Sequence, residues 1–252
     1  MRRRALIGNW KMHKTADEAG TYIREFLPLI QNIASVDVIL APPFTALHVV
    51  AALVKDTSIG LAGQDVHWDS QGALTGEVSP AMLYDSGCQS VIIGHSERRQ
   101  MFHEDDNAVN RKVKAAIAHH LTAIMCVGET REERANGKTS DVLTRQLLAG
   151  LAGIDAIDDT QLVLAYEPIW AIGSGTPATP TQANEVHAEL REHLGTLFTT
   201  AIAKSIRIVY GGSITTENIQ ALLATPHVDG GLVGGACLDP SNFARIVSSA
   251  AN

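Results

Sequence analysis

The segment that decides the fold is Leu164-Ala165-Tyr166-Glu167-Pro168-Ile169-Trp170-Ala171-Ile172-Gly173-Ser174-Gly175-Thr176-Pro177-Ala178-Thr179. Its first residues predict a buried strand that ends on a carboxylate, because Pro168 cannot donate to a strand ladder. The loop that follows carries Ile169, Trp170 and Ile172, which an exposed loop seldom holds unless something covers them. A strand end followed by a hinged apolar loop is typical of a catalytic carboxylate with a lid. The plainer alternative is an ordinary connection whose Glu167 faces solvent.

Working outward from this segment, the same succession of apolar strand and helix recurs along the whole chain. Strands are expected at residues 4–9, 36–41, 58–64, 90–94, 121–127, 161–166, 206–210 and 228–233. Helices are expected after residue 15, at 46–55, from 80, at 105–119, about 140–148, after 181, near 216–223 and from 240, with the charged segment 128–138 as a loop. Such alternation requires a parallel sheet, and eight units predict an α/β protein with a single closed (β/α)8 barrel domain over residues 1–252. A doubly wound open sheet is the alternative.

Composition narrows the class of protein. The 252 residues are 45% hydrophobic and 19% charged, which suits a large globular core, and the net charge of −7 offers no electrostatic footprint for nucleic acid. No run approaches the length of a membrane span, and the basic cluster Arg2-Arg3-Arg4 suggests a small surface tail. Three cysteines, Cys88, Cys126 and Cys237, are odd in number and lack metal-ligand spacing. They predict small buried side chains, a reducing compartment and a cytoplasmic location.

In a barrel of this kind the carboxyl ends of all strands surround one mouth. The residues that this places together are Asn9, Lys11, His95, Cys126, Glu167, Ser213, Gly234 and Gly235. Each alone has a plainer interpretation, such as a solvated lysine, a loop histidine or a cysteine packed at the barrel edge.

Three glycine-rich segments at the predicted mouth are candidates for holding a phosphate: Gly173-Ser174-Gly175, Gly211-Gly212-Ser213 and Gly234-Gly235-Ala236. Small residues let backbone N–H groups approach an anion, and the loops after the seventh and eighth strands often form a phosphate site. The alternative is that these glycines only permit tight turns.

Five segments together resemble the triosephosphate isomerase family: Gly8-Asn9-Trp10-Lys11-Met12, Gly94-His95-Ser96-Glu97-Arg98-Arg99, Tyr166-Glu167-Pro168-Ile169-Trp170-Ala171-Ile172-Gly173, Tyr210-Gly211-Gly212-Ser213 and Asp229-Gly230-Gly231-Leu232-Val233-Gly234-Gly235-Ala236. They follow in the family's order across nearly the whole chain. The resemblance implies a TIM barrel that interconverts dihydroxyacetone phosphate and D-glyceraldehyde 3-phosphate in glycolysis and gluconeogenesis, through an enediolate and without metal or cofactor.

The resemblance also implies a role for each matching residue. Glu167 is the base, His95 polarises the carbonyl, and Lys11, with Asn9 beside it, stabilises the developing charge. Backbone donors at Gly173, Ser213, Gly234 and Gly235 hold the phosphate, while Glu97 and Cys126 stand behind the reacting groups. Residues 168–178 form the lid, and the loop carrying Thr75 reaches the site of a second subunit in a homodimer.

The sequence departs from the family's pattern at a few positions, among them His103, where a Phe-Gly-Glu-like segment has glycine, Ser174, Pro177 at the second hinge of the lid, and Cys237. None of them removes a reacting group. Two other functions stay open: a Schiff-base aldolase on the same fold, and a barrel retained only for binding. The aldolase requires a lysine on a middle or late strand, and after Lys114 the sequence has only Lys138 and Lys204.

Overall fold

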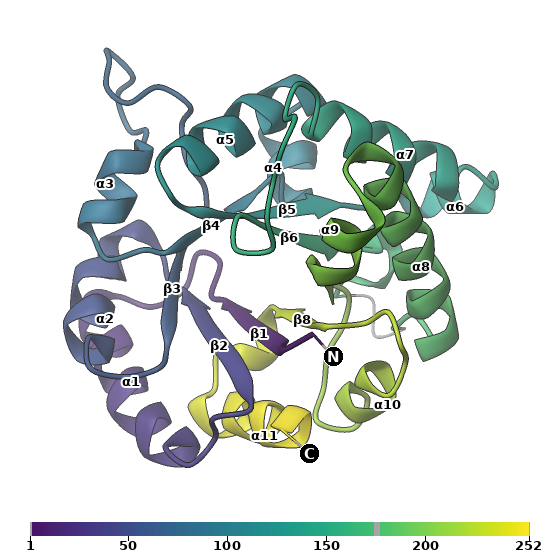
Figure 1. The fold of residues 1–252 in the computed structure, drawn as a ribbon. Helices are drawn as coiled ribbons and strands as arrows, with labels where there is room; N and C mark the ends of the chain where they lie inside the picture. Colours follow the sequence, from purple (N-terminus) through teal and green to yellow (C-terminus); the bar gives the residue numbers. More distant parts are fainter. Residues whose placement is uncertain (1, 174–176, 252) are drawn as a thin grey trace.

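The computed structural model describes residues 2–173 and 177–251, and among them eight parallel strands close into a barrel (Figure 1). The strands are β1 (Arg4–Asn9), β2 (Val36–Ala41), β3 (Gly60–Gly63), β4 (Ser90–Ile93), β5 (Thr122–Val127), β6 (Leu162–Tyr166), β7 (Arg207–Tyr210) and β8 (Gly230–Val233). β1 pairs with both β2 and β8, which closes the sheet. The barrel prediction is therefore confirmed, and the open doubly wound sheet is excluded.

Helices surround the strands as an outer ring (Figure 1). They are α1 (Ala16–Ile30), α2 (Leu47–Val54), α3 (Pro80–Asp85), α4 (Ser96–Met101), α5 (Asp106–Ala118), α6 (Arg131–Ala135), α7 (Thr139–Gly150), α8 (Pro180–Leu197), α9 (Thr200–Ser205), α10 (Ile219–Leu223) and α11 (Pro240–Ala251). Three 3₁₀ turns complete the described elements: η1 (Phe44–Ala46), η2 (Ile169–Ala171) and η3 (Gly235–Cys237). Thr15 and Ser79 cap α1 and α3 with their side chains, as their places in the sequence predict.

Apart from α4, whose start directly after His95 the sequence indicates, the expected helices lack α6 and α9. The expected loop at residues 128–138 contains α6, which begins with a capping box formed by Thr130 and Glu133. α6 buries none of its residues, so it leaves no apolar periodicity in the sequence. α9 follows α8 after only two residues and is capped by Thr199. Both helices are short, and their signals lie in the caps rather than in a hydrophobic stripe.

The core has two layers that follow the alternation of strand side chains. Along β1, Ala5 and Ile7 belong to an interior cluster with residues such as Ile124 and Val163, whereas Leu6 packs with the surrounding helices. The interior is filled with side chains, so a ligand has no room inside the barrel and must bind at a mouth. All three cysteines are buried and unpaired.

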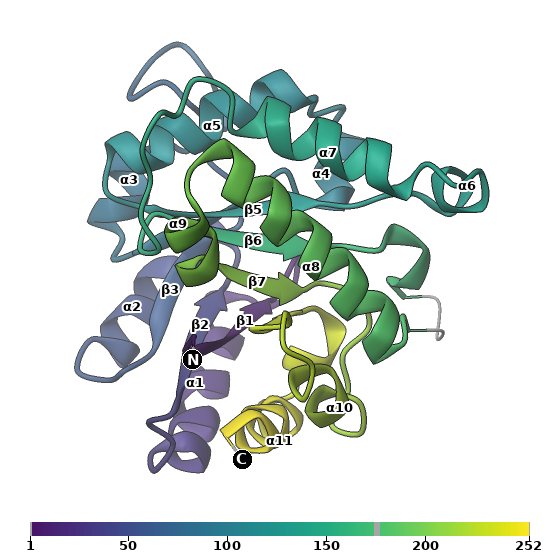
Figure 2. The same cartoon turned by 45° about the vertical axis from the view of Figure 1, so that its right-hand side comes forward.

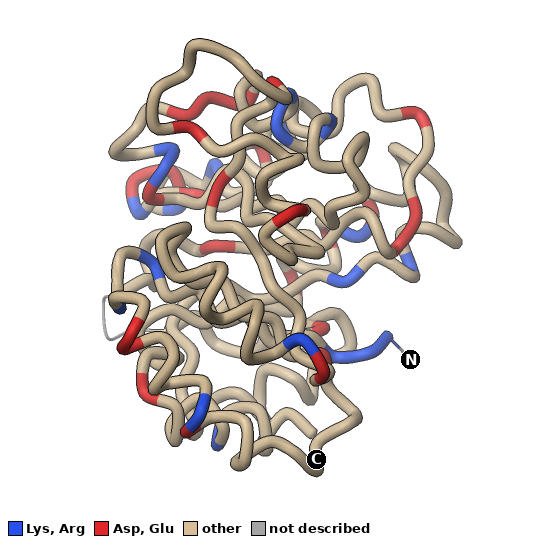
Figure 3. The backbone as a smooth tube through the Cα atoms, turned by 90° about the vertical axis from the view of Figure 1, so that its left-hand side faces the viewer, with Lys and Arg blue, Asp and Glu red and all other residues tan. Residues whose placement is uncertain are grey.

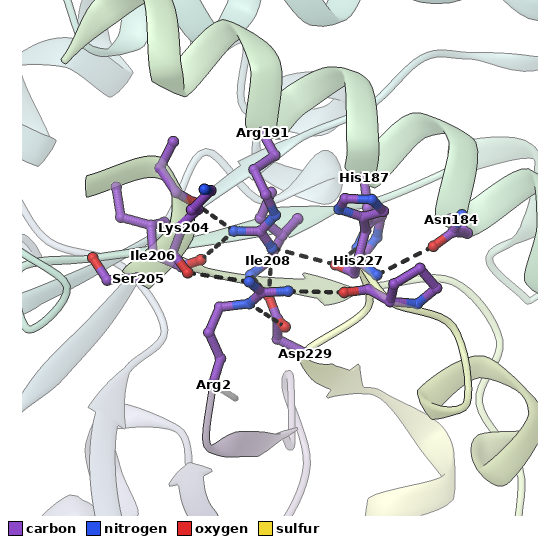
Figure 4. Close-up of polar contacts among 12 residues, drawn as sticks. Arg2, Asn184, His187, Arg191, Lys204, Ser205, Ile206, Ile208, His227 and Asp229 are labelled. Carbon is purple, nitrogen blue, oxygen red and sulfur yellow. Dashed lines mark hydrogen bonds and ion pairs between the residues drawn. The ribbon is translucent and has the colours of Figure 1, made fainter. Parts of the chain in front are cut away.

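A buried ionic network fixes the end of the barrel where the strands begin (Figure 4). The carboxylate of Asp229 receives Arg2 Nε at 2.6 Å on one oxygen and Arg191 Nη2 at 2.6 Å on the other. Arg191 also donates to the carbonyl oxygens of Ala203 and Ile206 at 2.6 and 2.8 Å. The interpretation of Arg2 as part of a surface tail was therefore wrong, because its guanidinium joins β1 to the elements around β8.

Elsewhere acidic and basic positions are interspersed along the backbone (Figure 3). In the described part of the chain no helix is both long and apolar enough to cross a membrane. The strand arrows of β6 and β7 point toward the side from which α6 projects (Figure 2), and the candidate site lies at that end.

Candidate active site

A cavity of about 330 Å³ lies at the carboxyl ends of the strands. It is lined by Asn9, Lys11, His95, Glu167, Ile172, Gly173, Gly211, Gly212, Ser213, Ile214, Thr215, Leu232, Gly234, Gly235 and Ala236. The cavity therefore brings together every predicted catalytic and substrate-binding residue. Larger clefts of about 850 and 580 Å³ lie at the opposite end, where strands begin, and none of those residues lines them.

Glu167 follows β6 and is buried beneath the mouth. Its Oε2 accepts the N–H of Ser96 at 2.9 Å, and its Oε1 lies 3.2 Å from Ser96 Oγ and 3.0 Å from His95 Nε2. Burial raises the pKa of Glu167, but His95 and the Ser96 donors lower it by more. The carboxylate is therefore ionised and hydrogen-bonded to donors at the N-terminus of α4.

Two glycines make room for Glu167. A Cβ atom on Gly128 would lie 1.8 Å from the Glu167 carbonyl oxygen, and one on Gly211 would lie 2.8 Å from its Cγ. Neither position tolerates a side chain without moving the carboxylate. Gly128 carries no recognisable signal in the sequence, because its contact with Glu167 arises only when β5 and β6 pair.

His95 caps the N-terminus of α4, where its Nδ1 accepts the N–H of Glu97 at 3.2 Å. Burial lowers the pKa of His95, whereas the facing Glu167 carboxylate raises it, and the net direction in this arrangement is upward. A second proton on Nδ1 would break the hydrogen bond from Glu97 and would face the positive end of α4. We therefore assign a neutral imidazole with its proton on Nε2, directed at Glu167.

Lys11 adopts a left-handed backbone conformation, with φ at 52°. The conformation is held on both sides, because Asn9 Oδ1 accepts the Lys11 N–H at 2.9 Å and Gln64 Nε2 donates to the Lys11 carbonyl at 2.8 Å. A non-glycine residue in this region costs about 1–2 kcal/mol, which these contacts offset. The ammonium lies 2.5 Å from Glu97 Oε1 and reaches toward Gly234. A fixed cation thus stands between α4 and the turn after β8.

On the glycine-rich side of the cavity, a ligand can approach the backbone closely. A Cβ on Gly212 would lie 2.2 Å from the hydroxyl of Tyr210, so only glycine fits there. Gly235 faces open space, and Gly173 has a φ of 64° that favours glycine. Together with Ser213, these residues form a wall of small side chains opposite Glu167.

The predicted lid is anchored at both ends. Trp170, in η2, donates its Nε1–H to Glu129 Oε1 at 2.8 Å, and its ring lies 4.3 Å from the guanidinium carbon of Arg134. At the other end the N–H of Ala178 donates to Tyr210 Oη at 3.0 Å. The predicted lid residues Ser174, Gly175 and Thr176 lie outside the described residues.

Cys126 does not line the cavity. It belongs to the interior cluster of the barrel, where the proximity of its thiol helps to lower the pKa of Glu167. Burial raises the pKa of the Cys126 thiol well above its usual range, so the thiol is protonated and unreactive. Across the described residues, no group of three or more His, Cys, Asp or Glu side chains is arranged to hold a metal ion.

Four residues contacting this site were assigned no role from the sequence: Ser96, Gln64, Glu129 and Gly128. Ser96 lies beside His95 in the family motif of residues 94–99, and this position could have indicated its role. Gln64 and Glu129 act from loops after β3 and β5, and their contacts depend on how neighbouring strands are aligned.

Taken together, a closed (β/α)8 barrel and a small cavity with a carboxylate, an imidazole and an ammonium group define an enzyme of the barrel class. The sequence profile of the triosephosphate isomerase family matches residues 4–250. The chain is 49% identical over 248 residues to triosephosphate isomerase of Geobacter metallireducens, covering 98% of this chain and 99% of the relative. It is 50% identical over 248 residues to that of Pelobacter propionicus, with the same coverage. The crystal structure of triosephosphate isomerase from Bartonella henselae superposes with a TM-score of 0.90 at 37% identity, covering 98% of each chain. The chain belongs to the triosephosphate isomerase family.

Proposed function

We propose that this protein interconverts dihydroxyacetone phosphate and D-glyceraldehyde 3-phosphate by proton transfer through an enediolate. The observation that carries the proposal is that Glu167, His95 and Lys11 line one cavity with three glycine-containing turns, in a chain of this family. A carboxylate base, a neutral donor and a cation are the groups that a carbon-to-carbon proton transfer needs.

In the proposed reaction Glu167 removes a proton from the hydroxymethyl carbon of the ketone, and the electron pair moves onto the carbonyl oxygen. His95 Nε2–H hydrogen-bonds to that oxygen and moves a proton between the two oxygens of the enediolate. Glu167 then returns its proton to the neighbouring carbon, which gives the aldehyde. This family is itself the established example of a glutamate base paired with a neutral histidine.

The hydrogen bonds of Glu167 suggest how its basicity changes during the reaction. At rest, His95 and Ser96 lower the pKa of this carboxyl, while burial alone raises it. A carboxylate that leaves those donors to face a carbon acid keeps the burial and loses the donors, so it becomes a stronger base. Glu167 precedes Pro168 directly, so we propose that closure of the lid, residues 168–178, moves the carboxylate toward the substrate.

The remaining groups stabilise charge. The Lys11 ammonium faces the enediolate and the phosphate, with Asn9 beside it and Glu97 as its ionic partner. Backbone donors at Gly173, Ser213, Gly234 and Gly235 hold the phosphate. The chemistry involves no change in oxidation state of the protein, and these groups supply the needed charge, so we propose a reaction without metal or cofactor.

We further propose that each subunit is one barrel domain, residues 1–252, and that two subunits form a homodimer. Exposed apolar side chains support this, including Met12 (93% exposed), Phe44, Leu74, Met101 and Phe102. A second cavity of about 220 Å³ shares Asn9, Lys11 and His95 with the first and is also lined by Met12, Phe44 and Phe102. The segment between β3 and α3 projects from the barrel (Figure 1), and its residues 71–77 are all exposed. We propose that the partner's Thr75 enters this second cavity.

A coupled assay with D-glyceraldehyde 3-phosphate tests the activity. Turnover in a chelator-treated sample is expected, and its absence in a folded protein would favour a barrel retained only for binding. Treatment with borohydride in the presence of substrate tests the aldolase alternative, because reduction of a Schiff base would inactivate an enzyme that uses a lysine. Neither Lys138 nor Lys204 lines the cavity. The cytoplasmic location, inferred from the unpaired cysteines, is part of the same proposal and is checked by cell fractionation.

A further inference from the structure

The 3₁₀ turn η3 follows β8 and presents Gly235 and Ala236 to the cavity. A turn of three residues cannot bond its own last carbonyl groups, so its shape depends on outside partners. Within the turn, Cys237 N–H donates to the Gly234 carbonyl at 2.9 Å, and Leu238 N–H donates to the Gly235 carbonyl at 3.1 Å.

Side chains from two helices supply the missing partners. The hydroxyl of Tyr22, on α1, donates to the Cys237 carbonyl at 2.8 Å, and Asn242 Nδ2, on α11, donates to the Ala236 carbonyl at 2.8 Å. All four carbonyl groups from Gly234 to Cys237 are thereby bonded to protein donors. With the carbonyl groups fixed on the side of the helices, the peptide planes of the turn are fixed as well.

Tyr22 is held rigidly enough to serve as an anchor. Tyr22 is 2% exposed, and its ring packs edge-on against Trp10 at 4.6 Å between centroids and at a tilt against Phe26 at 5.6 Å. The ammonium of Lys14 lies 4.9 Å from the ring centroid. Burial raises the pKa of Tyr22 far above its usual value, so its hydroxyl keeps the proton that it donates.

We propose that Tyr22 is a positioning residue for phosphate binding. Its hydrogen bond to the Cys237 carbonyl orients η3, so that the N–H groups of Gly234 and Gly235 face the phosphate beside Lys11. This inference rests on the proposed function and adds to it a residue that lies outside the cavity and outside the matching motifs. The orientation of η3 then depends on α1 as well as on β8.

The test replaces Tyr22 by phenylalanine, which removes one hydroxyl and keeps the ring. A neutral hydrogen bond contributes about 0.5–1.5 kcal/mol, which corresponds to roughly 2- to 12-fold in an equilibrium constant. Tyr22→Phe should raise the KM for D-glyceraldehyde 3-phosphate and the inhibition constant of inorganic phosphate within that range, while kcat changes less than about twofold. Tyr84→Phe is the matched control, because it removes a phenolic hydroxyl from a side chain that is 63% exposed on α3.

Unphosphorylated D-glyceraldehyde distinguishes a role of Tyr22 in phosphate binding from a purely structural role. Its kcat/KM should be the same in Tyr22→Phe and the unmodified protein, because it has no phosphate to contact the turn. Equal losses for both substrates, or a lowered melting temperature with unchanged KM and phosphate inhibition, would overturn the inference. Asn242→Ala removes the hydrogen bond to the Ala236 carbonyl and should also raise the KM and the inhibition constant of inorganic phosphate. This variant tests the orientation of η3 if Tyr22→Phe folds poorly. A lack of isomerase activity in the unmodified protein would instead refute the proposed function.

Discussion

At the scale of single residues, the surroundings of Glu167 and His95 act on the charge of these groups in opposite directions. Glu167 is buried, which disfavours its charge, and is surrounded by donors, which favour it. His95 has an acceptor role at one nitrogen and a donor role at the other. The sequence predicted these residues through their place after strands and the family resemblance. Their hydrogen bonds were not predictable, because Ser96 and Glu167 are 71 positions apart.

Replacing Glu167 by glutamine tests the proposed base. The amide keeps the shape and the burial but cannot take a proton from carbon, so kcat should fall by about 10²–10⁴-fold or more. Inhibition by inorganic phosphate should change little, because the turns that contact it are intact. Glu185→Gln, on the exposed face of α8, is the control and should retain full activity. A Glu167→Gln enzyme within tenfold of the unmodified protein would refute the assignment.

His187 gives a prediction about pH and stability. It is fully buried on α8, with its ring edge-on to Tyr166 and its Nδ1 3.2 Å from the His227 carbonyl. Burial lowers the pKa of His187 from 6.5 to about 3. The unfolded chain therefore binds this proton first, and the folded state loses stability as pH falls below 6.5, down to about 3. Linkage gives a loss of about 2 kcal/mol between pH 7 and pH 5 from this group.

The variant His187→Asn keeps a donor for the His227 carbonyl and has no group that titrates here. Urea unfolding at pH 7 and pH 5 should show that its free energy of unfolding falls by about 2 kcal/mol less than that of the unmodified protein. Since all other titrating groups are shared, the difference isolates His187. Parallel loss in the two proteins would show that His187 takes up its proton without unfolding.

At the scale of elements, the sequence predicted what apolar periodicity can predict. Every strand and each long helix was found, because burial imposes a period of two or of 3.6 residues. The missed elements, α6 and α9, are five and six residues long and depend on capping by Thr130 and Thr199. The contacts of Tyr22 with η3 were equally invisible, since they join residues 215 positions apart.

The end of α4 carries a strained residue that a substitution can relieve. His103 follows the C-cap Phe102 with a φ of 56°, a conformation that favours glycine. His103→Gly should raise the free energy of unfolding by about 0.5–1 kcal/mol, because the gain from relieved strain exceeds the added entropy of the unfolded chain. His119→Gly is the control: φ there is −107°, so no strain is relieved. A urea midpoint that moves equally in both variants would contradict this account.

We expect Pro177 to lie at the second hinge of the proposed lid, where its ring fixes φ near −65° and restricts the residue before it. Beyond it, Ala178 donates to Tyr210 and Thr179 caps α8, so these two residues are held in place. Pro177→Ala frees the open lid and adds up to about 1 kcal/mol to the cost of closing it. Affinity for a phosphate inhibitor should fall by no more than about fivefold, with proton transfer intact. Relaxation dispersion and inhibitor titration check this. Identical exchange rates and inhibitor affinities in the two proteins would show that Pro177 has no role in the hinge.

At the scale of the whole molecule, the two ends of the barrel are built differently. The end where strands begin carries the network of Arg2, Asp229 and Arg191, whose charged groups pair with one another within the chain. The other end carries the cavity, the proposed lid and exposed apolar side chains such as Met12 and Phe102. The predicted dimer is consistent with this asymmetry, because the exposed side chains of Met12 and Phe102 line the second cavity, which shares Lys11 with the site.

The dimer is tested by shortening residues 70–77. The subunit should become monomeric and lose nearly all activity, although its own Glu167 and His95 are untouched, because the partner's loop no longer supports Asn9 and Lys11. Sedimentation and the coupled assay measure both effects. A fully active monomer, either of the shortened or of the unmodified chain, would contradict the proposal.

Mixing two inactive variants makes the test sharper. A subunit with the shortened loop has an intact Glu167 but offers no loop to its partner, whereas a Glu167→Gln subunit has the loop but no base. When they pair, the Glu167→Gln subunit inserts its Thr75 loop beside Lys11 of the shortened subunit, and one complete site forms. Activity should therefore appear on mixing and should rise with the concentration of the Glu167→Gln subunit until the shortened subunit is saturated. Mixing with a Glu167→Gln subunit that also lacks residues 70–77 is the control and should restore nothing. If neither mixture is active while sedimentation shows mixed dimers, the loop holds the subunits together without completing the neighbour's site.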